Sequence, residues 1–459
     1  MRRCPRVCRA AGACAVALWA LLFPLRAGAF DLLDAYRLAV RNDPTIEVQR
    51  QSLAVAVDQT REARSALLPS LAANSQAGRT GGPVTYTGTP TLDRTFNTFA
   101  WTVQLTVPVL HLQELAAYRE SNRLAAQARA EFSRAQQDLI VRLAKAYFGV
   151  LIARDALDAA NAQWRAAEAQ RAAAQHSFER GVGSITDVDE ALARAAMARA
   201  QRASARSEID SKRAELEQII GPIPGASLAA LRADVRIGAP EPAALDRWVA
   251  QAQDNNPSVI ALRSAIDAAG FDLEKARAQR VPTVDLVGSY GRNYSSGNNI
   301  NPIDFATNGF AETAMLQMNM LLVDGGAVQA RISAAAAKEA KAQAQLEAAR
   351  RQAAVDARQA YEGVVDGLDR IGALQDAVEA GIRSVAGNRA GYRAGIRINT
   401  DVLDSERQRY AAQRDLAKAR YDTLLQTLKL KAAAGILDVA DLLRLNAMFV
   451  SSAVRDSLR

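Results

Sequence analysis

The chain has 459 residues, of which 49% are hydrophobic, 5% aromatic and 23% charged, and its formal net charge is +8. Its three cysteines all precede residue 15, and its two histidines, His111 and His176, stand far apart in the sequence. This composition excludes a disulfide-stapled domain and offers no histidine or cysteine cluster with metal-ligand spacing. There is also no glycine-rich phosphate loop or serine elbow, so we expect no enzyme, no catalytic residues, no metal site and no cofactor.

Residues 1–29 have the pattern of a secretory signal peptide. Four arginines precede an apolar run from Ala15 to Phe23, and Ala27-Gly28-Ala29 fits the small-residue rule of a cleavage site. Removing this segment takes away five arginines and all three cysteines, so 52 basic residues face 49 acidic ones and the net charge falls to +3. So small a positive charge argues against nucleic acid as a partner.

The rest of the sequence contains an internal duplication, in which corresponding residues lie 213 or 214 positions apart. Asn42-Asp43-Pro44 corresponds to Asn255-Asn256-Pro257, and the segment from Phe178 to Val188 corresponds to the segment from Tyr392 to Val402. A single duplication of this size predicts two similar structural repeats, residues 30–247 and 248–459, packed beside each other.

In the first repeat, a helical pattern runs from Asp31 to about Ala66 and is expected to break or restart at Pro44. A β-hairpin over about residues 70–110 follows, with a predicted loop from Gly78 to about Arg94. After the loop, the odd-numbered residues from Phe99 to Val109 are apolar, whereas most even-numbered ones are polar or small. This period of two predicts a strand with two unlike faces.

A helix of some 70 residues is predicted from His111 to about Arg180, because apolar or small residues recur there at steps of three and four and form a coiled-coil seam. A return helix ends at Ile220, before an equatorial segment over residues 221–247. The opening helix and the return helix together match the long helix in length. We expect them to stack end to end along it.

The second repeat has the same order. An opening helix precedes a β-hairpin over about residues 283–323, whose loop is predicted from Gly291 to about Gly309. Asp324-Gly325-Gly326 is predicted to be a turn from strand to helix, after which a long helix reaches about Ala394. A return helix and an equatorial C-terminal segment complete the repeat.

The alternating strands, flanked by Phe99, Trp101 and Tyr290, are typical of an outer-membrane barrel with a lipid face and a polar lumen. Two hairpins supply four strands, whereas a closed barrel needs about eight or more. Open strand edges are not tolerated in hydrocarbon, so several chains would have to contribute to one barrel. The alternative is a soluble periplasmic coiled-coil protein with ordinary hairpins and a structural or tethering role.

Five segments together resemble the TolC family of outer-membrane channel-tunnels. They are Asp34-Ala-Tyr36 with Asn42-Asp43-Pro44, the segment from Ala66 to Pro69, the turns at Phe178 to Val188 and at Tyr392 to Asp404, and Ala434-Gly435 through Asp441 to Asn446. The resemblance implies an α+β membrane protein with internal duplication. Its long α-helical coiled-coil barrel would continue into a transmembrane β-barrel shared among three chains, with four strands per chain.

The same resemblance implies a place and partners. The homotrimer would stand in the outer membrane of a Gram-negative bacterium, contact outer-membrane lipid and extend a helical tunnel into the periplasm. Its partners would be a periplasmic adaptor (membrane fusion) protein and an inner-membrane ABC or proton-driven transporter. Its role would be the passive exit duct of a tripartite system, for type I protein secretion or multidrug efflux, with an exported protein or a small molecule as cargo.

Asp401 and Asp404 are three residues apart and therefore lie on one face of the helix that follows the second turn. In a symmetric trimer each would form a ring of three carboxylates that attracts cations. The resemblance places such aspartates at the periplasmic constriction. Acidic residues at a helix N-terminus are also favoured by the helix dipole alone.

Tyr392 and Arg397 flank the second turn, and Thr186 and Asp187 follow the first. On the resemblance, we expect these four residues to bond with one another as a gate latch that holds the periplasmic entrance shut. Otherwise Arg397 is a solvated turn residue.

Three glycines, Gly181, Gly183 and Gly395, permit the tight turns between the long and return helices. Beside them, Val182 and Ile396 are expected to be exposed at the tips, where an adaptor would make contact. Glycine at a helix end is also ordinary capping.

Overall fold

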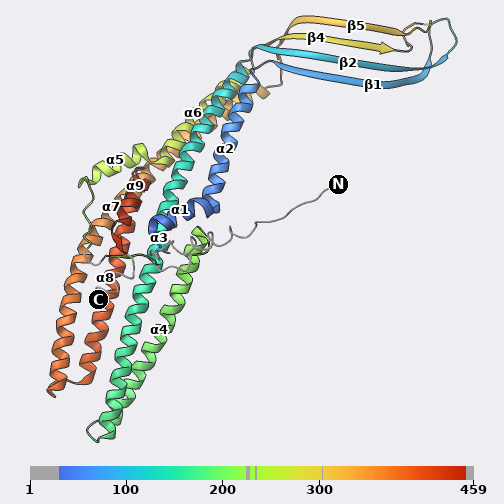
Figure 1. Ribbon diagram of the computed structural model, residues 1–459. Helices are drawn as coiled ribbons and strands as arrows, with labels where there is room; N and C mark the ends of the chain where they lie inside the picture. Colours follow the sequence, from blue (N-terminus) through green and yellow to red (C-terminus); the bar gives the residue numbers. More distant parts are fainter. Residues whose placement is uncertain (1–29, 224–227, 233–234, 302, 451–459) are drawn as a thin grey trace, which may run out of the picture.

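The computed structural model describes residues 30–223, 228–232, 235–301 and 303–450, and the predicted signal peptide lies outside these ranges. The described residues form a long helical rod with a four-stranded sheet at one end (Figure 1). Within them, no helix combines the length and the apolar character needed to cross a membrane.

The elements follow the same order in both halves of the chain. The first half contains α1 (Leu32–Asn42), α2 (Pro44–Ser65), β1 (Ser70–Val84), β2 (Leu92–Leu110), α3 (Leu112–Glu179), α4 (Ile185–Ile220) and the short β3 (Ala230–Leu231). The second contains α5 (Leu245–Asn255), α6 (Pro257–Ala278), β4 (Thr283–Ser295), β5 (Thr307–Asn319), α7 (Ala327–Arg393), α8 (Asn399–Ala433), α9 (Val439–Asn446) and β6 (Phe449–Val450).

The predicted break at Pro44 is confirmed, because α1 ends at Asn42 and α2 starts at the proline. A proline fits the first turn of a helix, where no partner for its missing N–H is needed. The residue before the proline caps the new helix: Asp43 Oδ1 accepts a hydrogen bond from the Thr45 N–H at 2.7 Å. Asn256 does the same for α6, accepting from the Ser258 N–H at 2.9 Å.

Both hairpins are present, but the predicted loops were too long. β1 continues to Val84 and β4 to Ser295, so only residues 85–91 and 296–306 connect the strands, and β5 ends at Asn319. Gly, Thr and Asn residues that suggested a loop are paired across the sheet instead, since strand pairing overrides their weak intrinsic preference. Gly291 is even required there, because a Cβ would lie 2.5 Å from the Trp101 carbonyl oxygen.

The sheet is antiparallel throughout, in the order β1-β2-β4-β5, and its two faces differ. Residues directly opposite each other on neighbouring strands lie on the same face. One face carries apolar pairs, including Leu71 with Leu105, Val107 with Leu286, and Leu286 with Leu316. The other carries polar pairs, including Asn74 with Thr102, Gln104 with Ser289, and Asp285 with Gln317. These sets define the apolar face and the polar face of the sheet.

The two long helices run from the sheet to the far end of the rod. As predicted, α2 and α4 lie one after the other along α3, with α1 between them (Figure 1). In the second half, α6 packs against both α3 and α7, and α8 packs against α7 and α3. Helix α3 therefore joins the two halves of the chain.

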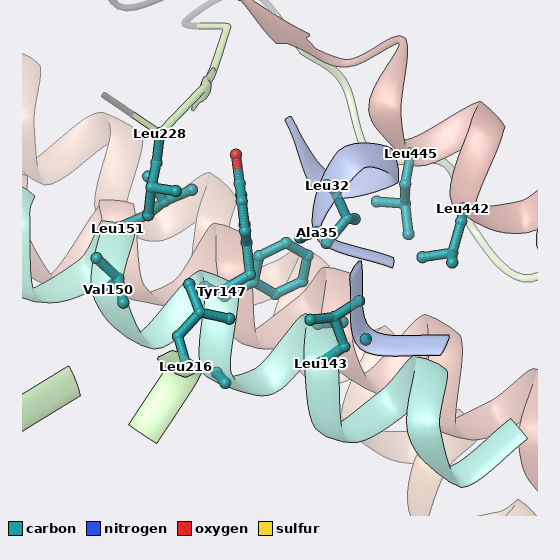
Figure 2. Packing of buried hydrophobic residues seen from close by; sticks show 14 of the residues in the cluster. Leu32, Ala35, Leu143, Tyr147, Val150, Leu151, Leu216, Leu228, Leu442 and Leu445 are labelled. Carbon is teal, nitrogen blue, oxygen red and sulfur yellow. The ribbon is translucent and has the colours of Figure 1, made fainter. Parts of the chain in front are cut away.

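The largest hydrophobic core lies midway along the rod, around Tyr147 (Figure 2). The fully buried Tyr147 hydroxyl lies 3.0 Å from the carbonyl oxygens of Phe30 and Ala229, and burial raises the pKa of this hydroxyl. Nearby, β3 pairs with β6, so the segment that follows α4 in the first half and the segment that follows α9 in the second half meet in a small antiparallel sheet that the sequence did not suggest. Closer to the tip, the contact between α3 and α4 is made mostly by alanines.

Candidate functional site at the helix turns

The turn between α3 and α4 closes on Gly181. Its φ is 76°, and its N–H donates to the Phe178 carbonyl at 2.9 Å. The next N–H, of Val182, donates to the Ser177 carbonyl at 3.0 Å. This pair of bonds is a Schellman motif, which requires a left-handed residue and hence favours glycine.

The turn between α7 and α8 repeats this geometry at Gly395, whose φ is 73°. The Gly395 N–H donates to the Tyr392 carbonyl at 3.1 Å, and the Ile396 N–H donates to the Gly391 carbonyl at 2.9 Å. The two tips thus have the same backbone, as the duplication implies. Their next residues differ, since Gly183 corresponds to Arg397.

Gly183 is required for space rather than for its φ. A Cβ at this position would lie 3.0 Å from the Ser177 Cβ and 3.1 Å from the Phe178 nitrogen. In the second turn, the residue that needs to be glycine is on the long helix instead. The Arg397 side chain lies over Gly391, and a Cβ at Gly391 would lie 2.8 Å from the Arg397 Cγ.

The tips present apolar side chains to solvent. Val182 and Ile396 are each 80% exposed, and Phe178, Ile185, Tyr392 and Ile398 are also exposed. Isolated exposed apolar residues are common, but six gathered on two short turns form a surface suited to a protein partner.

The side chains of Ser184 and Asp187 cap the start of α4, and Thr186 contributes its backbone N–H. The Ser184 Oγ accepts from the Thr186 N–H at 3.1 Å, and Asp187 Oδ2 accepts from the Ser184 N–H at 3.2 Å. This reciprocal arrangement is a capping box. The Asp187 side chain therefore has a local structural role at the turn, whereas Thr186 takes part through its main chain.

Arg397 pairs with Asp401 on the next turn of α8, with 3.5 Å between the guanidinium and the carboxylate. The Arg397 and Tyr392 side chains are both exposed. Within one chain, these contacts keep Arg397 at its own turn and Asp187 at the other, so the four predicted latch residues are not brought together there.

Asp404, on α8, lies near an arginine of the α3–α4 helix pair. Arg194 of α4 approaches it to 3.6 Å, and Arg407 of α8 to 3.9 Å. Arg194 is absent from our sequence-based set. The only sequence signal is that Arg194 and Asp404 both lie within the first three turns of the helices that leave the tips.

A second missed contact braces α7 against α8. The Glu406 side chain is only 8% exposed and accepts hydrogen bonds from Nε (3.1 Å) and Nη2 of Arg389. Asn388 also donates from Nδ2 to the Asp401 carbonyl at 3.3 Å. These bonds hold α7 and α8 together close to Asp401 and Asp404.

Within the described ranges, no three His, Cys, Asp or Glu side chains are grouped so as to hold a metal ion. His111 lies at the start of α3, where Nε2 is 2.8 Å from Asp285 Oδ1, and His176 Nδ1 is 3.3 Å from Glu179 Oε2. Each histidine thus has a carboxylate as partner.

The profile of the family "Outer membrane efflux protein" matches residues 35–222 and 248–436, one match in each half. The chain belongs to the outer membrane efflux protein family. The TolC-family resemblance seen in the sequence is thereby confirmed, and the protein is an outer-membrane protein with a periplasmic helical tunnel.

Among relatives in this family, the alkaline protease secretion protein AprF of Pseudomonas aeruginosa is 32% identical over 438 residues, which cover 94% of this chain and 90% of AprF. The outer membrane protein TolC of Escherichia coli is 28% identical, with 91% of this chain and 84% of TolC covered. The CmeC outer membrane channel of Campylobacter jejuni has the same fold, with a TM-score of 0.76 at 14% identity over 91% of this chain and 89% of CmeC. The predicted fold class, a helical tunnel with four strands per chain for a shared β-barrel, is confirmed.

Proposed function

We propose that three copies of this chain form a channel-tunnel that is the passive exit duct of a tripartite export system. The observation that carries the proposal is the sheet. It has one apolar and one polar face, and in the described residues its outer strands β1 and β5 each have a partner on one side only. In a membrane both open edges need a strand from another chain, and closure by three chains turns the polar face toward a common lumen.

The tips are the proposed contact for a periplasmic adaptor protein, which would connect the duct to an inner-membrane ABC or proton-driven transporter. The exposed Val182 and Ile396 support this, since Gly181, Gly183 and Gly395 hold them in rigid turns. The name of AprF, a protease secretion protein, favours a protein as cargo and type I secretion as the process.

We expect Val182→Asp and Ile396→Asp to reduce export while trimers still form, because neither side chain has packing to lose. Cross-linking of the trimer and the amount of secreted protein are the two measurements. Unchanged export in the double variant would exclude the tips as the adaptor contact.

The proposed gate lies just above these tips. Asp401 and Asp404 would form the cation-attracting rings, and Tyr392 and Arg397 would reach Thr186 or Asp187 of a neighbouring hairpin. Exposed ion pairs contribute only about 0–1 kcal/mol each. A few such contacts, repeated three times, hold a closed state that a docking partner can open.

Single-channel conductance in planar bilayers tests the pore and the latch together. We expect a small, cation-preferring current from the wild type and a larger one from the Tyr392→Phe, Arg397→Ser double variant. Arg393→Ser, which removes an exposed arginine at the same turn, is the matched control and should leave the current unchanged. Absence of current from every variant, with the protein in the aqueous phase, would instead support a soluble coiled-coil tether.

A further inference from the structure

The loop between β4 and β5 folds back onto the polar face of the sheet. Every second residue of β2 lies on that face, and this set runs from Arg94 and Phe96 through Thr98 to Thr102. The β1–β2 register is regular over this stretch, so Arg94 and Phe96 point to the same side as Thr102. The loop touches both residues.

Arg94 holds the loop by its main chain. Its Nη1 donates to the carbonyl oxygens of Asn298 and Asn301, at 2.7 Å each, and lies 3.9 Å from the Asp304 carboxylate. The Arg94 side chain is only 7% exposed, although it lies near the end of a strand. A guanidinium is buried at such a place only when its donors are satisfied, so these contacts position the loop.

Close packing brings the loop against the sheet as well. A Cβ at Gly297 would lie 2.8 Å from the Phe96 Cβ and 2.8 Å from Asp304 Oδ1. The Asp304 carboxylate therefore lies against Gly297 on the side of the sheet that Phe96 shares, which is the polar face. Before the loop turns, the Ser296 N–H still donates to the Asn97 carbonyl at 2.9 Å, which continues the strand pairing up to the bend.

Asn298 organises the rest of the loop. Its Oδ1 accepts from the N–H groups of Ile300 (3.1 Å) and Asn301 (2.8 Å), and its Nδ2 donates to the Ile303 carbonyl at 3.1 Å. The loop built on this side chain presents Ile300 and Ile303, which are 85% and 77% exposed.

We propose that residues 296–301 and 303–306 form a constriction at the outer mouth of the channel, with Arg94 as its positioning residue. The inference rests on the proposed trimeric barrel, in which the polar face lines the lumen. A loop held on that face projects over the lumen, and three copies narrow it. This constriction lies at the opposite end of the molecule from the helix turns (Figure 1).

Two constrictions along one pore act as resistances in series, so the narrower one determines the current. The outer constriction is therefore measurable only after the periplasmic end has been opened. For this reason Arg94→Ala is best examined in the Tyr392→Phe, Arg397→Ser background, in planar bilayers.

In that background we expect Arg94→Ala to raise the single-channel conductance about 1.5-fold or more. The matched control is Arg79→Ala, because Arg79 is an exposed arginine opposite Asn97, on the other face of the sheet. It should leave the conductance unchanged. Equal conductance of the Arg94→Ala variant and its background would overturn the outer constriction.

A second readout does not depend on removing Arg94. The chain after residue 14 has no cysteine, so Ile300→Cys introduces a single reactive thiol into the mature protein. A bulky methanethiosulfonate reagent, added on the side opposite the helical tunnel, should reduce the current of the opened channel. Full current after confirmed modification would overturn the proposal, whereas loss of channels from all variants, the unmodified background included, would overturn the trimeric pore itself.

Discussion

At the residue scale, the two halves use different side chains to cap α2 and α6 and to bond the carbonyls at the ends of α4 and α8. In the first half, Asn42 donates from Nδ2 to the Ile220 carbonyl at the end of α4, and Asp43 caps α2. In the second half, Asn256 both caps α6 and donates to the Ala433 carbonyl at the end of α8. The first half thereby has a buried carboxylate, which Arg142 Nη2 approaches to 2.7 Å.

This difference gives the first half its own pH dependence. Burial alone would raise the pKa of Asp43, but the hydrogen bonds from Thr45 and Arg142 outweigh it and lower the pKa. A carboxyl group with a lowered pKa in the folded state stabilises the protein at neutral pH, and this contribution is lost as the pH falls below about 4.

We therefore expect Asp43→Asn to cost about 1–3 kcal/mol of unfolding free energy at pH 7 and to weaken the loss of stability in acid. Denaturation of the detergent-solubilised protein between pH 7 and pH 3 measures both effects. Asp58→Asn, which removes an exposed carboxylate paired with Arg61, should behave as the wild type. The same acid profile for all three proteins would contradict this account.

At the element scale, the close approach of α7 and α8 depends on small residues. A Cβ at Gly367 would lie 2.3 Å from the Oγ1 of Thr423, which is itself buried. Gly372, further along the same helix, has nothing within 4 Å of an added Cβ. The two glycines thus differ in packing but share the same helical backbone.

Alanine at these two positions should have opposite effects. Gly367→Ala forces the helices apart and is expected to cost about 1–3 kcal/mol. Gly372→Ala only reduces the freedom of the unfolded chain and should gain about 0.5–1 kcal/mol. Thermal unfolding followed by circular dichroism compares them, and a shift of both midpoints in the same direction would refute the packing argument.

The helices could be predicted from sequence to within a few residues, whereas the strands could not. Helices α3 and α7 have a seam repeated over many turns, and glycines mark their ends. The outer parts of β1 and β4 are rich in glycine and polar residues, and become strands only because another strand lies beside them. The contacts of Arg194 and Arg389 were not predicted for a related reason. They depend on how separate helices pack against each other, which the sequence pattern alone does not show.

At the scale of the whole molecule, the core at mid-length connects the first and the last elements that the structure describes. Phe449 stacks on Phe148 with 6.0 Å between ring centroids, and its ring is edge-on to Tyr147. Asn446 accepts from the Leu32 N–H at 3.2 Å and donates to Asp31 at 2.8 Å. The start of α1 and the end of α9 are thus held together on α3.

Phe449→Ala should cost about 3–4 kcal/mol, because it empties a site among packed aromatic rings. Phe178→Ala, at an exposed tip, should cost about 0.5 kcal/mol or less. Unfolding midpoints test the difference. The channels that still form from Phe449→Ala should conduct as the wild type does, since this core is far from both proposed constrictions, and an altered conductance would contradict that separation.

The connections of the helices determine how each of them is linked to the sheet. Helix α3 follows β2 directly and runs without a break to the tip, so one continuous helix connects the strand to the far turn. The return helices α4 and α8 instead stop at mid-length, at Gly221 and Gly435, both with positive φ. Each is anchored to the sheet only through other helices. In the proposed gate, a displacement of a return helix at its tip would therefore reach the strands only through the helices packed beside it, whereas a displacement of α3 would act on β2 directly.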